Sequence, residues 1–470
     1  MNKSSSFVKK LYEAAPKEGF KILIITSRSE ENKDQLFTTA RRVKETCDKR
    51  KIPNYIVFVD DATIERVNSV SYIIHSSEDN KDFEFNPHET VALVRGSVTK
   101  FRSTLDLISQ LEKAGLFCIN YRDCMEICGD KYRTILKLAD IGVSTPKTAL
   151  IQNKKSIDHA LGIIGDKFPI VVKTLSGSHG IGVFFVESRK SLTSILQVIW
   201  KIDEEAELLI QEYVPTDFDV RAHVLGDKVI GAMRRDVIED DFRSNFSLGG
   251  KVKKYKLSKE EEEACLLAAK AVGGIWVGVD FIPTKDGLRV IEVNSSPGTE
   301  GIEEATKEDI VSVVLDYISD KNNWTYKATE CGYLETIHIK EFGDIVAKLD
   351  TGNGNHCALH ADEYTMDEKK KTVTWTFKGK KYKRDLVEIQ NTEVGGFHDH
   401  TEERPVVKFD IEFNNDLYPN IKCTLTNRET KISPILLNRY FMKKAKVMVN
   451  PGKKFVLSTK PKDEEKKDNE

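Results

Sequence analysis

The pattern of apolar and polar positions predicts alternating strands and helices over the first quarter of the chain. Three apolar runs have the length and composition of buried strands: 21–26, 55–59 and 90–94. The polar segment 33–49 and the periodic segment 101–114 predict helices, the second of which ends at Gly115. No Gly-x-Gly-x-x-Gly pattern follows the first strand. We therefore expect residues 1–118 to form a small α/β domain that binds a substrate or serves as a scaffold, rather than one that binds a dinucleotide.

A glycine-rich turn lies between two apolar strands in the next region. The strand 168–173 leads into the turn 177–182, and the strand 183–186 follows. Because a second strand follows the glycines, the pattern is neither a P-loop nor a Rossmann turn. Such a hairpin can fold over a nucleotide and direct its backbone N–H groups at phosphate oxygens, although an ordinary hairpin has the same pattern. Lys173, at the end of the first strand, would supply a cation for the phosphates.

Two carboxylates and a carboxamide mark a second hairpin. The apolar run 275–282, the turn 285–287 and the returning strand 288–291 predict it. It would bring three oxygen donors together: Asp280, Glu292 and Asn294. Hard oxygen ligands of this kind suit Mg²⁺, which keeps positions free for phosphates. The alternative is a polar strand end beside a Pro-Gly turn.

Polar groups that suit a nucleotide follow the strand 208–214. Adenine recognition needs backbone donors and acceptors beside apolar walls, and the candidates are Gln211, Glu212, Tyr213 and Val214, with Asp219 as a ribose acceptor. Further along come Arg234, Arg235, Arg243 and Asn245. Arginines near acidic metal ligands indicate the binding of a polyanion such as a triphosphate. Ion pairing at the surface is the other interpretation.

The composition is that of an ordinary globular protein. The net charge is −2 and 31% of the residues are charged, which gives no reason to expect nucleic-acid binding. No apolar run approaches the roughly twenty residues of a membrane span. The eight cysteines contain no Cys-x-x-Cys pair and no signal-peptide core begins the chain, so we expect reduced thiols and a cytoplasmic location. Residues 459–470 form a charged tail that we expect to be disordered.

The order of these pieces is similar to one known family. Lys173 precedes the glycine-rich turn, Gln211-Glu212-Tyr213 precedes Asp219, Asp-Phe-Arg-Ser-Asn stands at 241–245, and Asn-Ser-Ser-Pro-Gly stands at 294–298. Together they resemble the ATP-grasp ligases of the RimK type, which add glutamate to the C-terminus of a ribosomal protein. The resemblance covers about residues 90–325. It implies an ATP-grasp domain at 119–328 behind a pre-ATP-grasp domain at 1–118.

The resemblance also implies roles for single residues. The phosphates would contact Lys131, Lys173 and the glycine-rich turn with Ser178 and Gly180. Adenine would contact the backbones of Glu212 and Val214 within the segment Gln211–Val214, and the ribose would contact Asp219. The γ-phosphate would lie near Arg243 and Asn245. Asp280, Glu292 and Asn294 would hold two Mg²⁺ ions, or Mn²⁺. Arg221 and Arg235 would face the acceptor carboxylate or an acyl phosphate.

The implied activity is ATP-dependent formation of an amide bond. A carboxylate attacks the γ-phosphorus of ATP, and an amine then attacks the acyl phosphate and releases phosphate. The partners implied are glutamate or a similar amino acid and a peptide or protein C-terminus, with a ribosomal protein as one candidate. The resemblance implies a homo-oligomer, and nothing in the sequence indicates nucleic acid or membrane as a partner.

After about residue 330, short strands with turns replace the α/β alternation. Four of them are 336–339, 344–349, 372–377 and 406–413, and their spacing predicts a small β-barrel. Leu349-Asp350-Thr351-Gly352 resembles the loop of aspartic proteases, which needs a second aspartate to share one proton. The fold class expected for the whole chain is thus an α/β (α+β) ATP-grasp protein with an N-terminal pre-ATP-grasp domain and a C-terminal all-β retropepsin-like barrel.

Further segments of this barrel are similar to the RimB family, whose members are described as ATP-dependent zinc proteases with a retropepsin-like fold. They are Ala358-Leu359-His360-Ala361 and the runs 434–439 and 449–453, within residues 332–458. Asn353 and Asn438 depart from the small residue and the glycine usual in that family. Three interpretations stay open: an active peptidase that trims added residues, a pseudoprotease that binds peptide, and a dimerisation module. We interpret His356, His360, His398 and His400 as structural or solvated rather than as zinc ligands.

Overall fold

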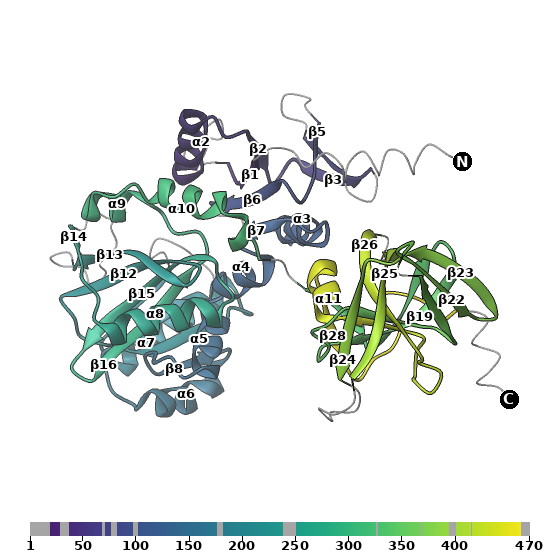
Figure 1. Ribbon diagram of the computed structural model, residues 1–470. Helices are drawn as coiled ribbons and strands as arrows, with labels where there is room; N and C mark the ends of the chain where they lie inside the picture. The colour runs from purple at the N-terminus through teal and green to yellow at the C-terminus, as the bar shows by residue number, and fades with distance from the viewer. Residues whose placement is uncertain are drawn as a thin grey trace. The chain divides into compact units, whose positions relative to one another are not determined.

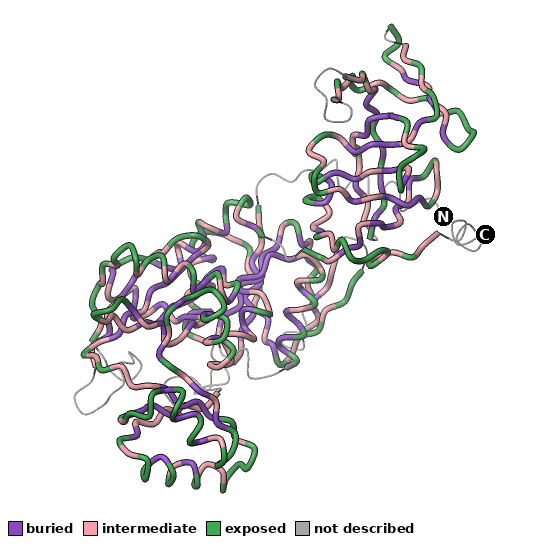
Figure 2. Tube along the Cα trace, turned by 90° about the horizontal axis from the view of Figure 1, so that it is seen from below, coloured by how far each residue is buried: buried purple, intermediate pink, exposed green. Residues whose placement is uncertain are grey.

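The chain folds into two compact units, which are described separately: Met1–Thr325 and Tyr326–Glu470 (Figure 1). The computed structural model describes residues 19–28, 37–67, 71–76, 82–96, 102–175, 182–237, 251–325, 328–367, 369–393, 401–414 and 416–461. The buried residues gather along the strands, and the outer faces of the helices are exposed (Figure 2). Within these ranges, no helix has both the length and the apolar character needed to span a bilayer.

The first unit begins with the predicted α/β domain. Its parallel sheet has the order β2-β1-β6-β7, formed by β1 (Lys21–Thr26), β2 (Asn54–Phe58), β6 (Thr90–Arg95) and β7 (Phe117–Ile119). The helices are α2 (Thr38–Arg50) and α3 (Arg102–Lys113). β6 is buried along its whole length, as expected for a parallel strand inside a sheet. Thr26 and Arg95 are paired in register at the carboxyl edge of this sheet.

A second sheet carries the glycine-rich turn. Its order is β10-β9-β11-β8, formed by β8 (Thr148–Ile151), β9 (Ile170–Thr174), β10 (Val183–Val186) and β11 (Leu208–Glu212). Helices α6 (Ile157–Ile164) and α7 (Arg189–Ile202) contribute apolar side chains to its core. Gly182 has φ +78°, and a Cβ there would come within 2.5 Å of Thr174 Oγ1. Glycine is therefore required where the turn returns into β10.

A third sheet carries the acidic hairpin. Its order is β14-β13-β12-β15-β16, formed by β12 (Phe218–Leu225), β13 (Lys228–Asp236), β14 (Val252–Lys254), β15 (Trp276–Thr284) and β16 (Gly287–Asn294). Helices α5 (Lys131–Asp140) and α8 (Lys259–Ala271) pack on it, and α4 (Arg122–Cys128), α9 (Glu300–Thr306) and α10 (Ile310–Ser319) complete the region. The predicted hairpin is thus present, with its turn at Lys285–Asp286.

The second unit is the predicted β-barrel. A sheet of order β18-β19-β27-β20-β26-β25-β24 closes through an additional pairing of β18 with β25. The strands are β18 (Leu334–Ile339), β19 (Gly343–Asp350), β20 (Cys357–His360), β24 (Glu388–Glu393), β25 (Thr401–Phe413), β26 (Asp416–Thr426) and β27 (Ile435–Asn438). A smaller sheet contains β21 (Tyr364–Asp367), β22 (Thr372–Phe377) and β23 (Lys380–Asp385), and β17 (Thr329–Gly332) pairs with β28 (Val447–Asn450). The short helix α11 (Arg439–Ala445) follows β27.

Candidate ATP and metal site

The predicted metal ligands lie side by side on one sheet face. Asp280 of β15 is directly opposite Glu292 of β16, and Gly278 is opposite Asn294. Residues directly opposite one another in an antiparallel pair project to the same face, as do residues two apart along a strand. The hairpin therefore gathers Asp280, Glu292 and Asn294, as the sequence predicted.

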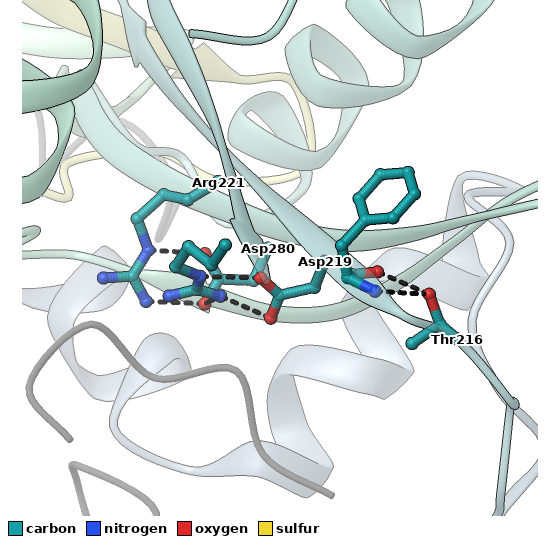
Figure 3. Close-up of polar contacts among 6 residues, drawn as sticks. Thr216, Asp219, Arg221 and Asp280 are labelled. Atoms are coloured by element: carbon teal, nitrogen blue, oxygen red, sulfur yellow. Dashed lines mark hydrogen bonds and ion pairs between the residues drawn. The ribbon is translucent and has the colours of Figure 1, made fainter. Parts of the chain in front are cut away.

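Asp280 is held by two arginines. Arg221 donates from Nε to Oδ1 at 2.6 Å and from Nη2 to Oδ2 at 2.5 Å. Arg235 donates from Nη2 to Oδ2 at 3.0 Å, and Figure 3 shows Arg221 facing Asp280. Burial opposes ionisation of Asp280, but the two guanidinium groups outweigh it and hold its pKa below the usual value. The carboxylate is therefore ionised at neutral pH.

Arg235 also joins Asp280 to Asp219. It donates from Nε and Nη2 to the two carboxylate oxygens of Asp219, at 2.7 and 2.6 Å. Its side chain is only 3% exposed. Burial alone would lower the pKa of Arg235, but Asp280 and Asp219 raise it above the ordinary arginine value. Arg235 is thus a permanent cation between two carboxylates, and Asp219, predicted for ribose, lies in this ion-pair network.

Lys173 lies near Glu292, and Glu292 belongs with Asp280 and Asn294 to one sheet face, which we call the carboxylate face. Its Nζ donates to Gln211 Oε1 at 2.8 Å, and Gln211 Nε2 donates to Thr148 Oγ1 at 2.8 Å. Desolvation lowers the pKa of Lys173 to about 8, with Glu292 raising it and Lys131 lowering it. Lys131, Lys173 and Glu292 are therefore near enough to interact electrostatically, which brings two predicted phosphate ligands to one predicted metal ligand.

The end of β11, which is predicted to bind adenine, already uses part of its backbone in hydrogen bonds within the protein. Glu212 donates its N–H to the Lys147 carbonyl at 2.9 Å, and its Oε1 accepts from the Lys147 N–H at 2.9 Å. The Tyr213 ring meets Phe185 edge to face, with centroids 5.0 Å apart. An adenine contact to the Glu212 backbone would therefore use its carbonyl. The predicted adenine contact of Val214 stays a prediction.

Four predicted ligands lie outside the described residues: Ser178, Gly180, Arg243 and Asn245. The contacts predicted for the glycine-rich turn and the γ-phosphate therefore stay predictions.

The sequence reasoning missed Arg95, at the end of β6. It is fully buried, and its three guanidinium nitrogens have no hydrogen-bond partner in the described part of the chain. The guanidinium lies 3.6 Å from the ring centroid of Trp276, and burial lowers its pKa to about 9. The signal available was an arginine directly after a buried parallel strand, at the edge where such sheets bind ligands.

Polar contacts attach this edge to the acidic hairpin. The Gly96 N–H donates to Ser296 Oγ at 2.9 Å. Asn120 Oδ1 accepts from the N–H groups of Ile275 and Trp276 at 2.7 and 2.9 Å, and its Nδ2 donates to the Ser295 carbonyl at 2.6 Å. The N-terminal sheet therefore contributes directly to the region around the predicted metal ligands.

The second unit has a cavity of about 320 Å³ at the Asp-Thr-Gly loop. Its lining includes Asp350, Arg404 and Arg428, and Asp350 is the only carboxylate among the described residues that line it. Asp350 Oδ1 accepts from the Gly352 N–H at 3.0 Å. Burial and Arg404 lower the pKa of Arg428, and Asp350 raises it. The cavity therefore carries one acidic group beside two cations.

The two residues that depart from the RimB pattern have structural roles. Asn353 Oδ1 accepts from the Asn355 N–H at 2.9 Å, and its Nδ2 donates to the His356 carbonyl at 3.1 Å. Asn438 caps α11 by accepting from the Phe441 N–H at 2.8 Å. Both asparagines thus stabilise the loop around Asp350.

The described histidines of this unit are paired with carboxylates. His356 Nε2 lies 2.8 Å from Glu388 Oε1, and His360 Nε2 lies 3.0 Å from Asp362 Oδ1. Across the described ranges, no group of three or more His, Cys, Asp or Glu residues is arranged to hold a metal ion. His398 and His400 lie outside those ranges.

Comparison with known proteins identifies the class. A family model of the RimK-like ATP-grasp domain matches residues 128–318, and one of the retropepsin-like aspartic endopeptidase RimB matches residues 330–460. A probable α-L-glutamate ligase 2 of Shewanella amazonensis is 33% identical over 287 residues, 60% of this chain and 92% of the relative. A probable α-L-glutamate ligase of Shewanella loihica is 36% identical over 228 residues, 48% of this chain and 74% of the relative.

A solved structure shares the fold of the first unit. A RiPP-associated ATP-grasp ligase of Chryseobacterium gregarium, solved with ADP and a leader and core peptide, has a TM-score of 0.50 at 16% identity, over 64% of this chain and 97% of that chain. The family model and the curated relatives together show that the protein is an ATP-grasp ligase. More particularly, it belongs to the RimK-type family of α-L-glutamate ligases, with a RimB-like domain after the ligase region.

ATP-grasp ligases use ATP and Mg²⁺, and the carboxylate face fits both. Glu292 and Asn294 lie beside Asp280, and Asn294 Nδ2 is buried without a hydrogen-bond partner in the described part of the chain. This leaves Asn294 free to turn its oxygen toward a cation. Asp280 already carries two guanidinium groups, so a cation there would share this carboxylate with Arg221, whose side chain is 19% exposed.

Proposed function

We propose that this protein adds glutamate to the C-terminal carboxylate of a peptide or protein, using ATP and two Mg²⁺ ions. The observation that carries the proposal is the acidic hairpin, with Asp280 opposite Glu292 and with Lys173 near enough to Glu292 to interact electrostatically. Further support comes from the family of α-L-glutamate ligases to which the chain belongs.

In the proposed reaction, a substrate carboxylate attacks the γ-phosphorus of ATP and gives an acyl phosphate and ADP. The amino group of glutamate then attacks the acyl carbon, and phosphate leaves. Lys173 and Lys131 would bind the phosphates, and Arg221 would be drawn from Asp280 toward the acyl phosphate. Mg²⁺, held by Asp280, Glu292 and Asn294, would neutralise the phosphate charge. Positioning of the two substrates would supply most of the remaining rate enhancement.

The remaining parts of the proposal follow the family resemblance. The adenosine would be bound by Gln211–Val214 and Asp219, and the γ-phosphate by Arg243 and Asn245. A ribosomal protein is the acceptor we would try first, and we propose a cytoplasmic homo-oligomer. We place the domain boundaries at 1–118, 119–328 and 332–458, with the tail at 459–470.

The test is ADP release by the full-length protein with Mg·ATP, L-glutamate and candidate acceptor peptides, followed by mass spectrometry of the peptides. We expect ADP release that depends on both substrates and a mass gain in steps of one glutamyl residue. ADP release without any gain in peptide mass would contradict the proposal.

A second candidate function concerns the RimB-like domain. Its cavity places Asp350 beside Arg404 and Arg428, and two cations suit a peptide with acidic side chains. We propose that this cavity binds the glutamylated product and, if a second aspartate joins Asp350 through a partner copy, cleaves it. Loss of mass from a glutamylated peptide without ATP would support cleavage, whereas binding without loss of mass would support a pseudoprotease.

A further inference from the structure

Three buried polar side chains without partners lie on or against the sheet that carries the predicted metal ligands. They are the Arg95 guanidinium, His223 Nε2 and Asn294 Nδ2, and none has a hydrogen-bond partner within the described ranges. Buried polar groups in folded proteins are nearly always paired, so each exception requires an explanation. All three are donors, which indicates that the missing partner is an acceptor, most simply an anion.

The strand register places these donors on the face that carries the carboxylates. His223 is opposite Gly278, which is opposite Asn294. This row lies two residues along the strands from the row formed by Arg221, Asp280 and Glu292, a spacing of about 7 Å. Trp276, beneath Arg95, lies two residues further in the same direction. The donors therefore flank the predicted reaction site without belonging to its ion pairs.

The protonation of His223 follows from its surroundings. Burial, together with Arg221 and Arg95, lowers its pKa to about 3, so the imidazole is neutral. Its Nδ1 lies 3.4 Å from Trp276 Nε1, which can only donate. The proton of His223 is therefore on Nε2, the atom without a partner. The ring offers a neutral N–H donor on the same side of the sheet as Arg95.

Among the described residues, no carboxylate is a partner of Arg95. Apart from burial, the ionisable neighbour that affects its pKa is the Cys124 thiol, and the Trp276 ring supplies a cation–π contact. An enclosed guanidinium without a carboxylate is unfavourable. A carboxylate ligand would give it the bidentate pairing that arginine favours.

We infer that Arg95 and His223 form a subsite for a carboxylate of the incoming amino acid that does not react. This inference rests on the proposed ligase function. The carboxylate that is phosphorylated has to lie at the row of Asp280 and Glu292, whereas Arg95 and His223 lie beyond it. A dicarboxylic amino acid bound there would keep its amino group free to attack the acyl phosphate. Asn294 would turn its oxygen to the metal and its Nδ2 to this carboxylate.

The inference is tested with Arg95→Met and His223→Leu in the full-length protein. We expect the KM for L-glutamate to rise about 10- to 100-fold in Arg95→Met, the range for a lost hydrogen bond to a charged group, and by less in His223→Leu, with the KM for ATP nearly unchanged. The matched control is Arg50→Met, which removes an arginine paired with Asp316 at the surface and should leave both constants unchanged.

Direct binding provides a second measurement that does not depend on turnover. Calorimetric titration of L-glutamate, L-glutamine and L-isoglutamine into the protein with Mg·ADP identifies which carboxylate is needed. We expect one of the two amides to bind far more weakly than glutamate to the wild type, and this discrimination to be lost in Arg95→Met. If Arg95→Met does not fold, Arg95→Lys replaces it. Lysine keeps the charge but cannot form the bidentate pair of a guanidinium, so we expect a partial loss of the discrimination between glutamate and its amides.

Two outcomes separate this inference from the proposed function. If the wild type ligates glutamate and folded Arg95→Met keeps the same KM and the same discrimination, the subsite is wrong and the ligase function stands. If the wild type ligates another amino acid but not glutamate, the proposed function fails, and the subsite stands only where that amino acid loses affinity in Arg95→Met.

Discussion

Single side chains on the carboxylate face combine structural and chemical roles. Arg235 bridges Asp219 and Asp280 from a position that is 3% exposed. Arg221 contacts the same Asp280 but is 19% exposed. We therefore expect Arg235 to fix the site and Arg221 to move when substrate binds.

The role of Arg235 predicts a large loss of stability. In Arg235→Met, the two buried carboxylates lose their shared cation, and we expect the unfolding free energy to fall by about 3–5 kcal/mol. Calorimetric or denaturant unfolding measures this loss. Arg234→Met is the matched control, because Arg234 is 35% exposed and pairs with Asp236, so it should cost about 1 kcal/mol or less. Equal losses for both variants would contradict the assigned role.

The pKa of Lys173 predicts a pH dependence. It falls from 10.5 to about 8 in the folded protein, so the folded state releases this proton first as pH rises. The free energy of unfolding should therefore rise between about pH 8 and pH 10.5, where the unfolded state binds more protons than the folded state. Phosphate binding needs the protonated amine, so kcat/KM for ATP should fall above about pH 8. Lys173→Arg should remove that fall, and an unchanged pH profile would sink the assignment.

At the scale of elements, the acidic hairpin follows from the sequence because its information is local. The turn 285–287 and the apolar runs on both sides fix the register that sets Asp280 opposite Glu292. The ion pairs of Asp280 depend on β12 and β13, which are distant in sequence. The geometry of these ion pairs could therefore not be predicted from the sequence. Arg95 was missed for the same reason, because it reaches the hairpin from the carboxyl edge of another sheet.

The glycine-rich hairpin predicts a specific effect of Gly182. In Gly182→Ala, the new Cβ has to adopt φ +78° and would approach Thr174 Oγ1 at 2.5 Å. Gly142→Ala is a matched control, because Gly142 has φ +76° and nothing within 4 Å of a Cβ. Both should lose about 1–2 kcal/mol for the backbone conformation, and Gly182→Ala should lose more. The KM for ATP should rise only in Gly182→Ala, and identical behaviour of both variants would contradict this.

At the scale of the whole molecule, the chain joins a ligase unit to a barrel with its own core. The barrel core includes Ile337, Leu349, Trp375, Phe409 and Leu437, so its fold follows from the alternating strands that the sequence predicts. The chemistry of the barrel could not be predicted from the sequence, because no nearby motif supplies the second aspartate with which Asp350 would share a proton.

This independence predicts that the two activities separate. Asp350→Asn should leave ligation unchanged, because Asp350 belongs to the second compact unit. The same variant should abolish any trimming of glutamylated peptides, because the amide cannot share a proton as a carboxylate pair does. Paired assays of mass gain with ATP and mass loss without ATP measure both. Trimming that persists in Asp350→Asn would exclude the aspartic-protease role.

The central claim is that the face with Asp280 and Glu292 activates a carboxylate with ATP. The most direct measurement is the mass of an acceptor peptide after incubation with Mg·ATP and L-glutamate, for the wild type, Glu292→Ala and the surface control Glu308→Ala, whose side chain is 50% exposed. We predict glutamyl additions by the wild type and by Glu308→Ala, and a rate lower by about 100-fold or more in Glu292→Ala, the scale of a lost electrostatic contact in a transition state. Full ligation by folded Glu292→Ala would contradict the account.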